Sequence, residues 1–196
     1  MGIRWPSRRG ITTPTSHTLP SGSTNESNSP HLILVGLPGS GKSTIGRRVA
    51  RRLARPFIDF DSEIERREGK SIAQIFSEVG EPGFRALELA LTRELAKTGG
   101  MVLAPGGGWT TIPGAAALLH PPARMIYLRV KTEVAIGRIL RGRRIRPLLQ
   151  TANPLDTLKT LLAEREAGYL EADHVIDVEV VKSQQLIATI ARLALP

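Results

Sequence analysis

The 196-residue sequence contains no cysteine, only four histidines and few aromatic residues, which make up 4% of the chain. Without cysteine, a disulfide framework, a thiolate metal site and a cysteine nucleophile are excluded. No two histidines have the three-to-five-residue spacing of a His-based zinc site. No uninterrupted apolar run approaches the roughly 20 residues that cross a bilayer, which excludes a membrane-spanning helix. The scarcity of aromatic residues also argues against a nucleic-acid-binding surface that stacks bases.

Positive charge is abundant instead: 27 Lys and Arg residues against 18 Asp and Glu residues give a net charge of +9. Such a balance fits nucleic acid, an acidic membrane surface or small anionic ligands. Residues 1–30 hold three arginines and one glutamate among many Ser, Thr and Pro residues, and are predicted to be a disordered tail. Residues 31–196 are predicted to form one domain in a cytoplasmic protein. A tail with few acids also suits an organellar transit peptide, which stays an alternative.

Two arginine clusters lie within the predicted domain. The first consists of Arg47, Arg48, Arg51, Arg52 and Arg55. Because Ile45, Val49 and Leu53 recur every four residues between them, these arginines are predicted to lie on the solvated face of a helix. The second consists of Arg138, Arg141, Arg143, Arg144 and Arg146. It is interrupted by Gly142 and Pro147, which predicts a loop or mobile lid over about 141–153 whose arginines cover phosphates.

Five short apolar segments alternate with helical patterns along residues 31–196. The predicted strands cover 31–35, 56–60, 100–104, 125–128 and 174–178. The predicted helices cover 42–54, 61–68, 71–79, 84–97, 111–119, a segment from 132, 154–170, and a last helix capped by Ser183. This alternation predicts an α/β fold in three layers, with a five-stranded parallel sheet covered on both faces.

The segment Gly36–Ser43 fits the pattern G-x-x-x-x-G-K-[ST] at every fixed position, between a predicted strand and a predicted helix. In this context the backbone N–H groups of the loop and the helix N-terminus surround a polyphosphate. Lys42 is expected to hold β- and γ-phosphate oxygens, and the Ser43 hydroxyl to ligate Mg²⁺. The sequence therefore predicts a P-loop NTPase, either a phosphotransferase or a nucleotide hydrolase.

Two carboxylates and three glycines are predicted to share the carboxyl edge of the sheet with this loop. Asp59 and Asp61 end the second strand and, at a period of two, point the same way. One would orient the water shell of Mg²⁺ and the other would accept a proton, although Asp61 could simply cap a helix. Gly106–Gly108 suggests a close backbone approach to a ligand. Considered singly, Arg85 and Arg165 are interpreted as structural, Arg165 in a surface ion pair.

Together, these motifs resemble the shikimate kinase family in order and spacing, over nearly all of residues 31–196. The matching segments are Gly36–Thr44, Asp59–Asp61, Phe84–Arg85, Gly106–Gly108, Arg146–Leu149, and Arg165 with Tyr169. The resemblance implies a nucleoside-monophosphate-kinase-like fold. It also implies transfer of the ATP γ-phosphoryl group to the 3-hydroxyl of shikimate by a monomer whose partners are small molecules, with no nucleic acid and no membrane.

The resemblance further implies a role for each matching residue. Catalysis is assigned to Lys42, Asp61 and Arg146, and shikimate binding to Asp61, Arg85, Gly107 and Arg165. ATP binding is assigned to Gly39, Ser40, Gly41, Lys42, Ser43, Thr44, Arg138 and Arg146. Mg²⁺ would be held by Ser43 and supported by Asp59.

The sequence departs from the family pattern at three places. Trp109 stands where the family usually has alanine, and would change the pocket if it faced inward; we expect it to pack away from the pocket. Ala104 and Pro105 replace a hydroxyl residue before the glycines. Ala167–Gly168 replaces Pro-Leu before Tyr169 and is expected to loosen the turn there. Trp109 is the reason to keep a kinase for a related hydroxy acid, such as gluconate, as the alternative.

Overall fold

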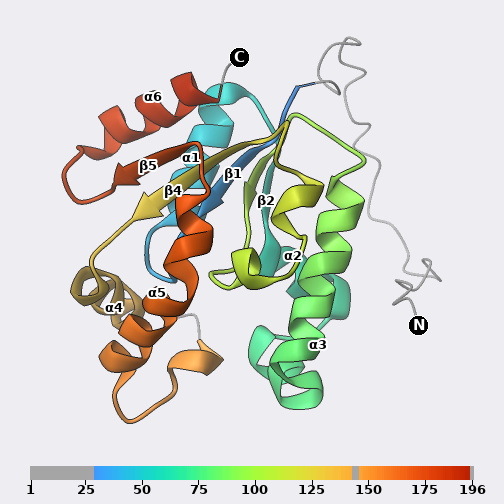
Figure 1. The fold of residues 1–196 in the computed structure, drawn as a ribbon, viewed down its shortest axis with the longest axis vertical. Coiled ribbons are helices and arrows are strands. Elements are labelled where there is room, and N and C mark those ends of the chain that lie inside the picture. The colour runs from blue at the N-terminus through green and yellow to red at the C-terminus, as the bar shows by residue number, and fades with distance from the viewer. Residues whose placement is uncertain (1–28, 143–145, 195–196) are drawn as a thin grey trace, which may run out of the picture.

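A computed structural model describes residues 29–142 and 146–194, and in it five parallel strands form one sheet, whose place among the helices Figure 1 shows. The strands are β1 (Leu32–Val35), β2 (Phe57–Asp59), β3 (Val102–Ala104), β4 (Arg124–Arg129) and β5 (His174–Asp177). Their order across the sheet is β2-β3-β1-β4-β5. The predicted α/β class and the five-stranded parallel sheet are confirmed. Because β1 lies at the centre, its carboxyl end delivers the glycine-rich loop to the middle of the sheet edge.

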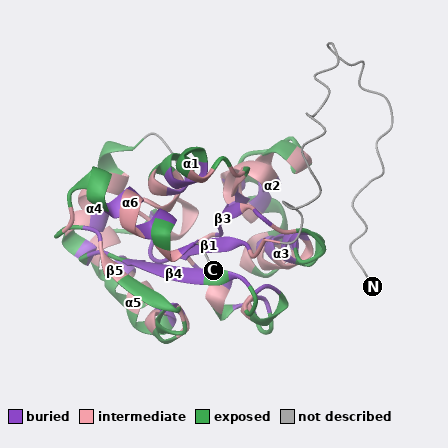
Figure 2. Ribbon diagram, turned by 90° about the horizontal axis from the view of Figure 1, so that it is seen from above, coloured by how far each residue is buried: buried purple, intermediate pink, exposed green. Residues whose placement is uncertain are grey.

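Six α-helices surround the sheet in the described part of the chain. They are α1 (Lys42–Leu53), α2 (Phe60–Glu68), α3 (Ile72–Leu95), α4 (Thr132–Arg141), α5 (Pro154–Leu170) and α6 (Ser183–Leu193). Figure 2 shows α1 and α6 on one face of the sheet and α5 on the other. All four residues of β1 are buried, as a strand covered on both faces requires. Gly46, Val49 and Ala50 are buried on α1, while Arg47, Arg48, Arg51 and Arg52 are exposed, as predicted. For Arg55 the prediction was wrong, because it lies beyond the end of α1, is half-buried and donates a hydrogen bond to the Pro30 carbonyl at 3.3 Å.

Several helix ends follow from local sequence signals. Ser71 and Gln74 form the predicted capping box of α3, and the Asn153 side chain caps α5. Gly80, with φ of 65°, kinks α3 between the two helices that were predicted separately. At α6 the prediction was wrong, because Ser183 is the first helical residue and Lys182 occupies the cap position. The Ser183 hydroxyl instead accepts a hydrogen bond from Nη1 of Arg48 in α1.

Two other expectations need correction. Residues 111–119 do not form an α-helix: the 3₁₀ turns η2 (Trp109–Thr111) and η3 (Ala116–Leu118) lie at the two ends of this segment, and residues 112–115 between them form a bend and a turn. Pro113 lacks an N–H and Gly114 takes a φ of 74°, so the α-helical hydrogen-bond ladder cannot run through them. The predicted tail is two residues too long, because the Ser29 carbonyl accepts a hydrogen bond from the Gly100 N–H at 2.6 Å. Residues 1–28, where most of the tail prediction falls, lie outside the described residues.

The predicted lid is only partly described. Arg138 and Arg141 lie on α4 rather than in a loop, and residues 143–145 lie outside the described residues. Arg146 follows that gap, and Pro147–Leu149 forms a 3₁₀ turn, η4. None of the helices in the described ranges is long and apolar enough to cross a membrane.

Candidate active site

The loop between β1 and α1 has the backbone geometry of a phosphate-binding loop. Gly39 has a φ of 83°, and a Cβ there would lie 2.5 Å from the Ala135 carbonyl oxygen, so only glycine fits. Gly41 precedes the first residue of α1, whose N-terminal N–H groups have no side-chain cap. Free N–H groups at a helix N-terminus attract anions, so these residues have the local backbone structure that the predicted phosphate site needs.

This loop forms one wall of a cavity of about 420 Å³ at the carboxyl edge of the sheet. The cavity is lined by Gly39, Gly41, Lys42, Ser43, Thr44, Asp59, Asp61, Ala104–Gly107, Arg138, Ile139, Gly142 and Arg146. It therefore brings together all but one of the residues assigned to ATP and Mg²⁺. The exception is Ser40, which is fully buried behind the loop and does not line the cavity.

Lys42 is held at the cavity floor by carbonyl oxygens of its own loop. Its Nζ atom donates hydrogen bonds to the carbonyls of Gly36 at 2.7 Å and Leu37 at 3.0 Å. Burial lowers the pKa of Lys42 from 10.5 to about 8, and the positive charge of Arg146 acts in the same direction. A phosphate anion would oppose both effects, so the site favours a bound polyphosphate beside a charged Lys42.

Asp59 and Asp61 both reach this cavity, but by a different local structure from the one predicted. The strand ends at Asp59, whose Oδ1 accepts a hydrogen bond from the Ser62 N–H at 3.0 Å and so caps α2. The cap is therefore Asp59, not Asp61, which lies in the first turn of the helix. Asp59 Oδ2 accepts a hydrogen bond from the Ser43 hydroxyl. Ser43 and Asp59 are thus in direct contact, and their assignment to Mg²⁺ stays a prediction.

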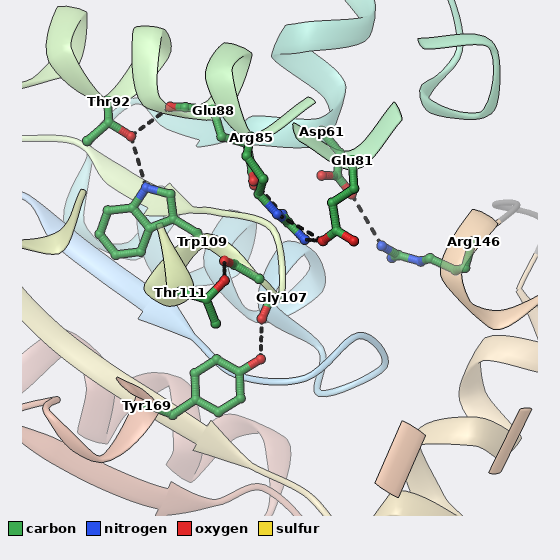
Figure 3. A network of polar contacts seen from close by, with 11 residues as sticks. Asp61, Glu81, Arg85, Glu88, Thr92, Gly107, Trp109, Thr111, Arg146 and Tyr169 are labelled. Carbon is green, nitrogen blue, oxygen red and sulfur yellow. Dashed lines mark hydrogen bonds and ion pairs between the residues drawn. The ribbon is translucent and has the colours of Figure 1, made fainter. Parts of the chain in front are cut away.

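A second pocket adjoins the first. It is lined by Pro38, Asp61, Ile72, Phe76, Phe84, Arg85, Gly106–Gly108, Arg146–Leu149, Leu161 and Arg165. Asp61, Gly106, Gly107 and Arg146 line both pockets. Nη1 of Arg146 lies 3.2 Å from Oδ2 of Asp61, so this ion pair stands where the two pockets meet (Figure 3). Ligands bound in the two pockets would therefore lie next to each other.

Two glutamates of α3 hold Arg85 in the second pocket. Arg85 donates to Glu88 through Nη1 and to Glu81 through Nη2, each at 2.5 Å (Figure 3). Burial raises the pKa of Glu88 from 4.5 to about 7, while the Arg85 charge opposes this rise. Neither glutamate was predicted as part of the site, although their spacing of four and three residues from Arg85 places them on one helix face.

Arg165 is buried, with 5% of its surface exposed, so the interpretation as a surface ion pair was wrong. It lines the second pocket from α5, whose buried residues Leu158, Arg165 and Tyr169 face the domain interior. The Tyr169 hydroxyl donates a hydrogen bond to the Gly107 carbonyl (Figure 3). The chain around Ala167–Gly168 is not loosened, because α5 continues through it to Leu170.

The glycine triplet approaches protein atoms closely as well as lining the pockets. A Cβ on Gly106 would lie 2.4 Å from Glu88 Oε1, one on Gly107 2.7 Å from Pro38, and one on Gly108 2.2 Å from Arg85. These close approaches are to neighbouring side chains of the protein, and the expected approach to a ligand stays a prediction. Trp109 is fully buried and does not line either pocket, so packing away from the pocket, as expected, is confirmed.

A parallel sheet that presents a phosphate-binding loop beside a second pocket with two arginines defines a P-loop kinase of the nucleoside-monophosphate-kinase-like type. Residues 38–194 match the family model described as shikimate kinase. The chain belongs to the shikimate kinase family, whose members are ATP-dependent kinases.

Individual relatives agree with this assignment. A shikimate kinase of Pseudomonas fluorescens is 49% identical over 150 residues, which cover 76% of this chain and 87% of that protein. A solved shikimate kinase of Acinetobacter baumannii, in complex with shikimate, superposes with a TM-score of 0.79 at 38% identity, covering 85% of this chain and 93% of that one. A gluconokinase of Sinorhizobium meliloti has a TM-score of 0.57 at 16% identity, covering 84% and 91%, which shows a shared fold alone.

Proposed function

We propose that this chain transfers the γ-phosphoryl group of ATP to the 3-hydroxyl of shikimate, giving ADP and 3-phosphoshikimate. The observation that carries the proposal is the pair of adjoining pockets, with Asp61 and Arg146 at their boundary. The acceptor pocket presents Arg85 and Arg165, which suit a carboxylate because a guanidinium donates two parallel hydrogen bonds to it. The relative from Acinetobacter baumannii, described with bound shikimate, supports the choice of acceptor.

In the proposed reaction the acceptor oxygen attacks the γ-phosphorus while the bond to the bridging oxygen of ADP breaks. The Asp61 carboxylate orients the acceptor hydroxyl and accepts its proton. Lys42 holds β- and γ-phosphate oxygens, and Arg146 neutralises charge on the transferring group. Gly39, Gly41, Ser43 and Thr44 hold the phosphates from the loop, and Arg138 lies beside it, with Nη1 3.3 Å from the Gly39 carbonyl.

We assign the buried Ser40 to a supporting role in the loop. Its N–H donates a hydrogen bond to the Leu37 carbonyl at 3.2 Å, which keeps the loop turned toward the cavity. On the acceptor side, Arg85 and Arg165 hold the carboxylate, and the Gly107 backbone contacts the substrate ring. The carbonyl of Gly107 is already occupied by Tyr169, so its position is fixed before substrate arrives.

The residues present fit a magnesium ion. Ser43 Oγ and an Asp59 carboxylate oxygen are in contact at the edge of the phosphate cavity, and Mg²⁺ prefers such oxygen ligands while keeping several waters. When bound, the ion neutralises phosphate charge during transfer. Ser43 would ligate it directly and Asp59 would orient its water shell, while the contact of Asp59 with Ser62 keeps that carboxylate fixed.

A coupled assay of ADP release tests the proposal. We expect release that depends on both shikimate and Mg²⁺, and little release from Lys42→Met, which removes the phosphate-binding cation. The acceptor panel includes gluconate, the alternative substrate. No observation favours gluconate, since Trp109, the reason for considering it, lies outside the pocket. Turnover with gluconate but not with shikimate would overturn the proposal.

We further propose that the protein acts as a monomer in the cytoplasm on small molecules alone, without nucleic acid or membrane. The two pockets are lined by the assigned reactive residues of a single chain, so the proposed reaction needs no residue from a second copy. Light scattering coupled to size exclusion checks the mass, and fractionation of cells checks the location. A mass of two chains that persists at assay concentration would contradict the first of these expectations.

A further inference from the structure

The short turn that follows the glycine triplet is anchored on its core side by Trp109. The indole Nε1–H donates to Oγ1 of Thr92 at 2.9 Å, and Thr92 Oγ1 in turn donates to the Glu88 carbonyl at 2.8 Å (Figure 3). The ring packs edge-on against Phe60, with 6.4 Å between centroids and an angle of 77°. These contacts attach the turn to α3, which carries Arg85, and to Phe60, which directly precedes Asp61.

On the other side the same turn contacts α5 at Gly168. A Cβ on Gly168 would lie 2.9 Å from Cβ and 3.0 Å from Oγ1 of Thr110, and 3.4 Å from its carbonyl oxygen. Two of these atoms belong to a short, β-branched side chain that has few ways to move aside. The Thr110 hydroxyl is buried and has no hydrogen-bond partner among the described residues, so this contact is close packing alone.

The two residues that α5 contributes to the acceptor side lie close to Gly168 in sequence. Tyr169, the next residue, donates its hydroxyl hydrogen bond to the Gly107 carbonyl. Arg165, three residues earlier and therefore on the same region of the helix, lines the acceptor pocket together with Gly107. The separation between α5 and the Thr110 turn consequently sets the positions of Arg165 and Tyr169 relative to the glycine loop.

We propose that Gly168 is a positioning residue for the acceptor: the missing side chain lets α5 approach the Trp109-anchored turn closely enough for Arg165 and Gly107 to share one pocket. The inference rests on the proposed function for the identity of the acceptor. A positioning role of Gly168 can be told from a purely structural one. A displacement of α5 would change the acceptor pocket, which Arg165 lines, but would leave in place the P-loop, which lies on the opposite side of Asp61 and Arg146.

The central variant is Gly168→Ala, which adds only the Cβ. We expect the KM for shikimate to rise by about tenfold or more, because a displacement approaching 1 Å at a binding group has effects of this order. The KM for ATP should stay within about twofold, since no ATP-binding residue lies on α5. Gly137→Ala is the matched control, because a Cβ at this helical glycine of α4 would meet only Arg141 atoms, at 3.8 and 3.9 Å.

The rescue variant is Thr110→Gly combined with Gly168→Ala, which removes both side-chain atoms that the new Cβ would meet. We expect the KM for shikimate of the double variant to return most of the way to the parent value. Urea unfolding of the parent, the two single variants Thr110→Gly and Gly168→Ala, and the double variant should show a favourable coupling free energy between the two sites. The unfolding cycle is informative even where a variant is poorly active, because it does not require turnover.

The outcomes separate this inference from the proposed function. If the parent protein shows no shikimate-dependent ADP release, the proposed function fails, and the unfolding cycle alone decides whether Gly168 and Thr110 are coupled. If the parent is active and Gly168→Ala keeps its KM for shikimate, the positioning role is overturned. Equal increases in both KM values, or a double variant no better than the single one, would also overturn it.

Discussion

The guanidinium of Arg146 and the carboxylate of Asp61 are joined by an ion pair, with 3.2 Å between Nη1 and Oδ2, at the boundary of the two pockets. Arg146 directly precedes the turn η4, whereas Asp61 belongs to the first turn of α2, so the pair connects the lid side to the sheet edge. A polyphosphate carries more negative charge than one carboxylate and competes for Arg146. In the proposed reaction its arrival would therefore release Asp61 to the acceptor hydroxyl, while Arg146 would turn to the phosphoryl group.

This relationship predicts the effect of removing Arg146. In Arg146→Ala we expect kcat to fall on the order of 10³-fold, the usual contribution of an arginine that neutralises a transferring phosphoryl group. The KM for shikimate should change by only a few-fold, because Arg85 and Arg165 remain. Steady-state kinetics with each substrate varied in turn measure both effects. Arg141→Ala, an exposed arginine of the same cluster on α4, serves as the control; equal losses in the two variants would contradict the assignment.

Lys42 predicts a pH dependence of activity. Its pKa is lowered to about 8 by burial and by Arg146, so the free enzyme loses the ammonium charge as the pH rises through about 8. Since phosphate binding needs that charge, kcat/KM for ATP should decline above pH 8, with a pKa near that value. Initial rates between pH 6.5 and 9.5 measure the profile. A kcat/KM that stays flat to pH 9.5 would contradict this prediction.

The lowered pKa of Lys42 also makes the stability of the protein depend on pH. The folded-state pKa of about 8 lies below the ordinary value of 10.5, so between these values the unfolded chain binds more protons than the folded chain. The unfolding free energy of the parent should therefore gain a contribution as the pH rises through this window. Lys42→Met lacks this contribution and should be more stable than the parent at pH 7, by a margin that shrinks toward pH 10. Urea unfolding at both pH values checks it.

The raised pKa of Glu88 predicts the opposite pH dependence of the unfolding free energy, over a lower pH range. Burial raises its pKa from 4.5 to about 7, so the folded chain binds more protons than the unfolded chain between these values. The unfolding free energy of the parent should therefore lose a contribution as the pH rises from 4.5 through 7, on the order of 1–3 kcal/mol. In Glu88→Gln this loss is absent. The comparison is made by urea unfolding at pH 5 and pH 8.

The control for this experiment is Glu78→Gln, which removes an exposed glutamate that pairs with Lys70 on the surface. It should follow the pH dependence of the parent, because an exposed pair contributes little to stability. If Glu88→Gln also follows the parent, Glu88 titrates like an ordinary carboxyl group, and burial does not control its charge.

Much of the fold was predictable because its signals are local. The apolar segments that become β1 and β3 are buried on both faces, so their residues mark them directly. The capping box at Ser71 and the cap at Asn153 depend on residues three positions apart. The phosphate-binding loop is likewise continuous in sequence, so its chemistry could be assigned without knowing any tertiary contact.

The features that were missed depend on contacts between distant segments. Burial of Arg165 cannot be read from its neighbours Glu164 and Glu166, because it is set by how α5 faces the glycine loop. Ser183 and Arg48 are 135 residues apart, and their hydrogen bond replaces the local cap that was predicted. At Asp59 the strand ended one residue earlier than expected, since Phe60 turns into the core as the first residue of α2.

Substitution of Trp109 should lower the stability of the protein without changing its choice of acceptor. Its ring is fully buried, and its N–H is bonded to Thr92, so Trp109→Ala should lower the unfolding free energy by about 3–5 kcal/mol. Trp109→Phe keeps an aromatic ring against Phe60 and should cost less, mainly the lost hydrogen bond and the smaller volume. Because Trp109 lines neither pocket, the folded Phe variant should keep the parent's preference for shikimate over gluconate. Urea unfolding and the ratio of kcat/KM for the two acceptors measure these effects. A ratio shifted toward gluconate in Trp109→Phe would contradict the prediction and show that the indole ring affects acceptor specificity.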